Sequence, residues 1–138
     1  MPTLDRDLSQ SQPSTTASHR PTPALLQVIL FQIIQGLGFT EDTEGSVEDL
    51  PSRETQRRAM MVLAQIPLRL LWKPNIDVFC GEIHMQWVNG DKQVVVMCFP
   101  SQPTLVHHYQ NIPNGVSEHG IELASKEQVD YWLQWMRQ

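Results

Sequence analysis

Histidine and acidic side chains are the residues of this sequence best suited to do chemistry. Glu82 and His84 lie in a stretch of alternating polar and apolar residues, which places both on one face of a strand. Such a pair could act as a general acid and base or bind a metal ion. His107 and His108 are adjacent, so on a strand they point to opposite faces and cannot readily bind one ion. We therefore expect no metal site, and we keep one alternative function: a small enzyme with a polar site of Glu82, His84 and His108 on the open face of the sheet.

Other catalytic patterns are missing from the sequence. It contains no Gly-x-Ser-x-Gly nucleophile motif, and Gly36 and Gly38 lack the third glycine and the preceding strand of a dinucleotide-binding loop. Cys80 and Cys98 lie in apolar, strand-like stretches, where a reduced cysteine behaves as a small buried hydrophobic residue. We therefore predict no catalytic residues and no cofactor, and we favour a protein that is not an enzyme.

The charge balance bears on partners and location. With 15 acidic and 10 basic residues and a formal net charge of -5, the chain lacks the excess of lysine and arginine that binds a phosphate backbone. We expect no nucleic acid partner. The first residues do not have the basic-then-apolar pattern of a secretion signal, which favours a cytoplasmic location with reduced thiols. The most apolar segment is too short to span a bilayer, so no membrane association is expected.

Composition divides the chain into a tail and one domain. Residues 1–21 are rich in Ser, Thr, Gln and Pro and hold too few apolar side chains to offset the entropy cost of ordering, so they are predicted to be a disordered tail. Residues 22–138 are predicted to form a single α+β domain. Within this domain, residues 39–50 carry five acids and no base, which is typical of a solvated loop.

Three helices are predicted in the domain. The first covers Ala24–Leu37, between a pair of prolines and a pair of glycines. The second follows Ser52 as its N-cap and ends near Gln65, before a proline. The third begins at Ser125, which forms a capping-box pattern with the glutamine three residues later.

The region from residue 76 to residue 110 is predicted to be an antiparallel sheet. Polar and apolar residues alternate over 82–87, and Asn89-Gly90 favours a tight type I′ turn into a return strand at 94–99 that is apolar on both faces. Strands at 76–79 and 104–109 flank this hairpin, and residues 111–123 are predicted to be a loop. The fold class is therefore α+β: two N-terminal helices, a small antiparallel β-meander of three to four strands, and a C-terminal helix packed on the sheet.

The order of these motifs resembles a group of small uncharacterised bacterial αβ proteins. The motifs are a helix ending in Gly38-Phe39, an acidic linker, a second helix, and the strand Gly81-Glu82-Ile83-His84-Met85-Gln86-Trp87 that enters a hairpin. In that group a Gly-Trp-Asp-Gly turn and a Gly-Gly-x-x-Leu-x-Trp strand recur, whereas Phe39 stands here in place of the tryptophan and the Asp-Gly is absent. The resemblance implies a non-enzymatic accessory role, of the kind encoded beside toxin or defence genes.

The first helix is the best candidate for a binding surface. Its apolar residues lie almost all round it, because Val28 and Phe31 interrupt a stripe of glutamines. A small domain seldom surrounds a helix on every side, so this helix forms part of a self-association or partner interface, or is buried under the acidic loop. On the C-terminal helix, Tyr131 and Trp135 lie off the centre of the apolar stripe.

The favoured function is a non-enzymatic binding or accessory protein that acts through protein–protein contacts, antitoxin-like, immunity or chaperone-like in kind. Its partner is either another protein or a second copy of the chain. The candidate partner-binding residues are Val28, Phe31, Gln32, Gln35, Tyr131 and Trp135.

Overall fold

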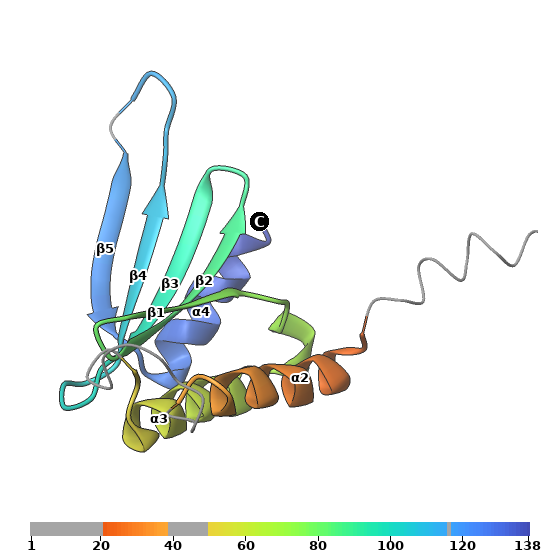
Figure 1. The fold of residues 1–138 in the computed structure, drawn as a ribbon. Helices are drawn as coiled ribbons and strands as arrows, with labels where there is room; N and C mark the ends of the chain where they lie inside the picture. The colour runs from red at the N-terminus through yellow and green to blue at the C-terminus, as the bar shows by residue number, and fades with distance from the viewer. Residues whose placement is uncertain (1–20, 39–49, 116) are drawn as a thin grey trace, which may run out of the picture.

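The computed structural model describes residues 21–38, 50–115 and 117–138. These ranges hold a five-stranded sheet and three α-helices, with the N-terminal helices crossing one end of the sheet and the C-terminal helix behind it (Figure 1). The elements are α2 (Pro23–Gln35), α3 (Arg53–Gln65), the short 3-10 helix η2 (Leu68–Leu70), β1 (Asn75–Phe79), β2 (Glu82–Asn89), β3 (Lys92–Cys98), β4 (Leu105–Gln110), β5 (Glu118–Leu123) and α4 (Lys126–Met136). Residues 1–20 of the predicted tail and residues 39–49 of the acidic segment lie outside the described ranges.

The helix starts follow the capping residues of the sequence. The side-chain oxygens of Thr22, Ser52 and Ser125 accept hydrogen bonds from the backbone N–H groups three residues later, which satisfies donors that have no partner within the helix. Gly36 is the C-cap of α2, and Ile66, the C-cap of α3, directly precedes a proline. The three predicted helices are therefore confirmed. None of the helices in the described ranges combines the length and the apolar composition that a membrane crossing needs.

The five strands form an antiparallel meander in the order β1-β2-β3-β4-β5. The α+β class is confirmed, but the prediction of three to four strands and of a loop over residues 111–123 is wrong, because β5 occupies the second half of that segment. Gly120 belongs to β5 and lies opposite His108. A Cβ atom at Gly120 would lie 2.6 Å from Cε1 of His108, so this glycine makes room for the ring and does not mark a turn.

The turn between β2 and β3 lies one residue away from its predicted position. Asn89 pairs with Lys92, so the β2–β3 loop is Gly90-Asp91 and not Asn89-Gly90. Gly90 has a φ of 64°, as a glycine at the first central position of a type II′ turn requires. The β1–β2 turn is formed by Cys80 and Gly81, which have φ values of 51° and 79°. Cys80 is therefore exposed, contrary to the prediction of a buried residue.

The core lies between the sheet and the three helices. The apolar residues of β2, β3 and β4 that point toward the helices are fully buried, and the Trp87 indole N–H donates to the Trp72 carbonyl at 2.7 Å. The main core residues are Ile83, Met85, Trp87, Val94, Val96, Cys98 and Val106 from the sheet, and Leu30, Ile34, Leu63, Leu133 and Met136 from the helices. The thiol of Cys98 is buried as predicted, and burial raises its pKa to about 12. β3, the strand that is apolar on both faces, is central in the sheet, and no described helix covers its outer face.

Candidate functional site

The exposed side of α2 is apolar where a surface helix is normally polar. Leu26, Leu30 and Ile34 face the core, which leaves the opposite side of the helix to solvent. On the solvent side Leu25 is 51% exposed and Val28 is 48% exposed. An amphipathic surface helix places polar residues at such positions, so this face has the composition of a contact surface.

Two glutamines fix α2 against α3. The Gln27 amide donates to the Leu63 carbonyl at 3.2 Å, near the start of α2 and the end of α3. The Gln56 amide donates to the carbonyls of Ile34 and Gln35 at 2.9 and 3.2 Å, and so satisfies acceptors at the C-terminal end of α2. The two helices are therefore antiparallel neighbours whose backbones are held together at both ends.

A groove of about 640 Å³ lies between these two helices. Its floor and walls are largely apolar, and glutamine and arginine side chains stand at one end. The lining residues are Phe31 and Gln35 from α2, and Arg53, Gln56, Arg57, Met60, Met61 and Ala64 from α3. On α3 the positions 53, 57, 60 and 64 follow one another at helical spacing, so a single stripe of this helix faces the groove. The arrangement is an apolar groove with basic groups at the N-terminal end of α3.

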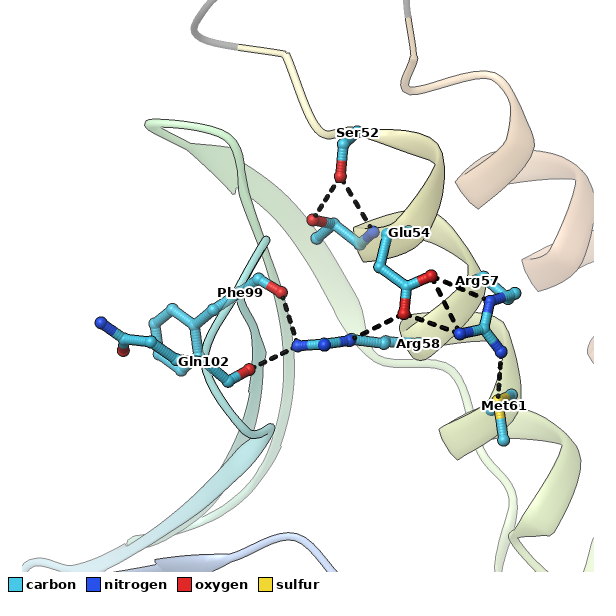
Figure 2. Close-up of polar contacts among 8 residues, drawn as sticks. Ser52, Glu54, Arg57, Arg58, Met61, Phe99 and Gln102 are labelled. Atoms are coloured by element: carbon cyan, nitrogen blue, oxygen red, sulfur yellow. Dashed lines mark hydrogen bonds and ion pairs between the residues drawn. The ribbon is translucent and has the colours of Figure 1, made fainter.

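The arginines of α3 have different environments (Figure 2). Arg57 binds the Glu54 carboxylate through Nε and Nη2 at 2.6–3.1 Å, and its Nη1 lies 3.4 Å from the Met61 sulfur. The hydrogen bond from Arg57 lowers the pKa of Glu54. Arg58 points the other way, toward the loop between β3 and β4, where it donates to the Phe99 and Gln102 carbonyls. Arg58 is thus structural, whereas Arg53 and Arg57 remain at the groove.

The structure separates the predicted residues of α2 into two kinds. Val28, Gln32 and Gln35 are exposed, as the interface hypothesis requires. Phe31 is half-buried and packs against the core cluster, so it is less exposed than these three residues. The reason is that Phe31 lies on the side of α2 next to α3, where it lines the groove together with Met60.

The two predicted residues of α4 belong to a different surface. Trp135 is half-buried, lies under the Lys92 ammonium at 4.9 Å from its ring centroid, and makes an edge contact with His108. Tyr131 is 59% exposed and makes an edge contact with Trp132. Contacts within the fold therefore cover much of the Trp135 side chain, and Tyr131 is the more accessible of the two residues.

The proposed polar enzyme site is not assembled. His84 and Glu82 do meet on the helix-free face, with 2.9 Å between Nε2 and Oε1. His108 points to the opposite face of the sheet, where its ring stacks on Trp132 with 3.5 Å between centroids. Burial lowers the pKa of His108. In the part of the chain that is described, no group of three or more His, Cys, Asp or Glu side chains is placed to hold a metal ion.

Sequence reasoning missed the α3 wall of the groove. The sequence predicts no role for Arg53, Arg57, Met60 or Met61, and all four line the groove. One signal was present in the sequence, because Met60 and Ala64 occur at helical spacing with the two arginines, and a purely solvated face would not carry them. What the sequence could not give is the side of α2 on which α3 lies. Comparisons with known protein families, with curated proteins and with solved structures find no match to this chain.

Proposed function

We propose that this protein is a non-enzymatic binding protein whose α2–α3 groove receives an amphipathic helix of a partner protein. The observation that carries the proposal is the composition of the groove, which combines an apolar floor with two arginines at one end. Apolar grooves between helices are a recurrent mode of helix recognition, in which side chains at positions i, i+3, i+4 and i+7 of the bound helix act as anchors. In this role the protein acts by covering a segment of its partner, as accessory proteins of the antitoxin, immunity or chaperone kind do.

The side chains of the groove suit a helix with acidic residues beside its apolar anchors. Phe31, Met60 and Met61 offer an apolar surface, and methionine adapts its shape to different partners. Arg53 is exposed at the N-terminal end of α3, where the helix dipole adds partial positive charge. Arg57 already binds Glu54 but is 61% exposed, so its guanidinium can also meet a second carboxylate.

Two designed peptides test this proposal. Both are amphipathic 15-residue helices with the same leucine spacing, and one carries glutamates where the other carries lysines. We expect the glutamate peptide to bind with a dissociation constant of about 10–100 µM in calorimetry, and the lysine peptide to bind at least about tenfold more weakly.

Variants then locate the binding site. Met61→Glu introduces a carboxylate into the groove and should weaken binding of the glutamate peptide by about tenfold or more, because it adds repulsion and removes an apolar contact. Gln65→Glu adds the same charge to an exposed position of α3 outside the groove lining, and should change binding by less than about twofold. Arg53→Glu should abolish the preference for the glutamate peptide. Failure of the parent protein to bind either peptide, or equal effects of Met61→Glu and Gln65→Glu, would refute the proposed groove.

A further inference from the structure

The helix-free face of the sheet carries an uncharged patch on β3, β4 and β5, which we call the β3–β5 patch. The register places its nine outward side chains in three rows across the strands. The rows are Met97–Leu105–Leu123, Val95–His107–Ile121 and Gln93–Tyr109–His119. Leu123 is 63% exposed and Ile121 is 58% exposed, so the β5 part of the patch is as open as a typical polar surface.

This composition is unusual for the exposed face of an antiparallel sheet. Such a face is normally polar, and edge strands such as β5 commonly carry charged residues that prevent pairing with other chains. In the described ranges, no lysine or arginine points outward from this face. The eight described basic residues lie in helices, directly after α4, in the loop before β1, or on the side of the sheet that faces α4. They are Arg53, Arg57, Arg58, Arg69, Lys73, Lys92, Lys126 and Arg137. The carboxylates of this face, Asp77 and Glu82, lie on β1 and β2, outside the patch.

We propose that the β3–β5 patch binds the same patch of a second copy of this chain, with a two-fold axis that runs along β4. Rotation about this axis leaves the position along the strands unchanged and places β3 of one copy over β5 of the other. Each row of the patch therefore contacts the same row of the second copy. Met97 then lies over Leu123 of the second copy, and Val95 lies over Ile121 of that copy. Leu105 meets its own equivalent on the axis. Apolar side chains thus meet apolar side chains, and this is the self-complementarity that an isologous interface needs.

The third row matches in the same way. Gln93 lies over His119 of the second copy, and Tyr109 meets its own equivalent, so amide, imidazole and hydroxyl groups find hydrogen-bonding partners across the contact. The strands of the two sheets run in nearly the same direction, which is the aligned packing that sheets prefer. The contact is thus a small β-sandwich with a polar row at one end.

The carboxylates favour this axis over the other simple arrangement. An axis across the strands, through the middle row, would bring β1 and β2 into the contact together with Asp77 and Glu82. It would also reverse the order of the rows, so the polar row of each copy would lie on the apolar row that contains Met97 in the other copy. The axis along β4 leaves both carboxylates beyond the β5 edge of the second copy, where they stay in water. Because the patch has no charge, it offers nothing to a partner that binds through opposite charge, and a second uncharged patch is its best match.

The size of the patch sets the expected strength. Three strands about 4.8 Å apart, each about 20 Å long, form a flat area of roughly 14 by 20 Å on each copy. Specific interfaces start at about 1,200 Å² of total buried surface, and the flat areas of the two copies together come to roughly half of that, so the contact belongs to the weak, transient class. We therefore expect a dissociation constant on the order of 10–100 µM.

Protonation should oppose the contact. His107 meets its own equivalent on the axis, and two imidazolium groups there would repel each other in a partly dehydrated site. The neighbours of His107 on β3 are Gln93, Val95 and Met97, none of which has a titratable side chain. The titratable neighbours are His119 on β5 and Tyr109 on β4 itself. Burial and the nearby His119 lower the pKa of His107, so the His107 side chains of both copies are neutral at pH 7.5. Association should therefore be strongest at neutral pH and weaken as the pH falls toward 5.5.

Sedimentation equilibrium of the full chain between about 5 and 500 µM tests the proposal. We expect a monomer–dimer equilibrium at pH 7.5 that Ile121→Lys weakens by at least about tenfold, because a lysine would be buried against Val95 of the second copy. The control Leu68→Lys alters an exposed leucine of η2, 44% exposed, and should leave the equilibrium unchanged. A parent protein that stays monomeric at 500 µM, or a loss of dimer in Leu68→Lys and not in Ile121→Lys, would overturn the proposal.

The pH dependence gives a second, independent readout. The parent dimer should weaken about fivefold or more between pH 7.5 and 5.5, and the double variant His107→Gln, His119→Gln should lose most of that dependence. A parent dimer of equal strength at both pH values would put the two histidines outside the contact and overturn the axis along β4. Neither experiment depends on the α2–α3 groove, so the peptide experiments and these can fail separately.

Discussion

The two faces of the sheet have different tasks. Along β2 the residues toward the helices, Ile83, Met85 and Trp87, are completely buried, whereas Glu82, His84 and Gln86 between them are only half-buried. The helix side is constrained by packing, because its buried side chains must fit against the other residues of the core. Packing against the helices does not constrain the outer side. Its uncharged residues on β3–β5 are therefore available for contacts with other molecules.

The largest test of this difference compares neighbouring residues of β2. Trp87→Ala should lower the free energy of unfolding by about 3–5 kcal/mol, because it leaves a cavity and removes the donor to the Trp72 carbonyl. Gln86→Ala should lower it by less than about 1 kcal/mol, because it loses only the half-buried hydrogen bond to Gln93. Urea unfolding followed by circular dichroism measures both. Similar losses for the two variants would show that the outer face is packed after all.

A smaller loss of stability is expected from a substitution of Gly120, the β5 residue that contacts the ring of His108 on the helix side of the sheet. Gly120→Ala should cost about 1–3 kcal/mol, because the new Cβ would lie 2.6 Å from Cε1 of His108, whose ring is held by the stack on Trp132. The same substitution in a His108→Ala background should cost less than about 0.5 kcal/mol, since Gly120 does not have a positive φ. Urea unfolding of the two single variants and the double variant gives the coupling. Equal costs in both backgrounds would contradict the close approach.

The comparison also explains which elements the sequence predicted. The helices carry local signals in Thr22, Ser52 and Ser125, and the alternation along β2 depends only on the strand period, so both could be predicted without tertiary information. β5 could not be predicted, because a glycine such as Gly120 is typical of a turn. Only the tertiary structure shows that Gly120 makes room for the ring of His108. The turn at Gly90 was displaced by one residue because the dipeptide signal does not fix the pairing register.

The candidate site was predictable on one side only. Val28, Phe31 and Gln35 emerged from the apolar excess of a single helix, which is a property of the local sequence. The wall formed by Met60, Met61 and the arginines depends on how α3 lies against α2, and that is set by contacts between residues more than twenty positions apart, such as those of Gln56. Likewise, the rows of the β3–β5 patch exist only once the register of three strands is known.

The smallest expected effect compares the adjacent histidines of β4, one on each face. Burial lowers the pKa of both His107 and His108 below the ordinary value near 6.5, so the folded protein holds fewer protons than the unfolded chain as the pH falls through that range. Their contribution to stability is therefore complete above about pH 6.5 and is lost as the pH falls through the lowered pKa values. The pKa of Glu54 is also lowered, but this carboxylate changes the stability only below about pH 4.5. A change in stability between pH 7.5 and 5.5 therefore reports on the histidines.

The measurement is the urea midpoint at pH 7.5 and at pH 5.5, at about 1 µM protein, so that self-association does not contribute. The urea midpoint of the parent protein should fall on acidification, by less than Trp87→Ala or Gly120→Ala lowers it. His107→Gln and His108→Gln should each reduce that fall. His108→Gln also loses the stack on Trp132, so the comparison rests on the pH dependence of each variant and not on its absolute stability. A parent midpoint that is the same at both pH values would show that neither face excludes water from its histidine. A fall that only His108→Gln removes would confine the effect to the helix side and widen the difference between the two faces.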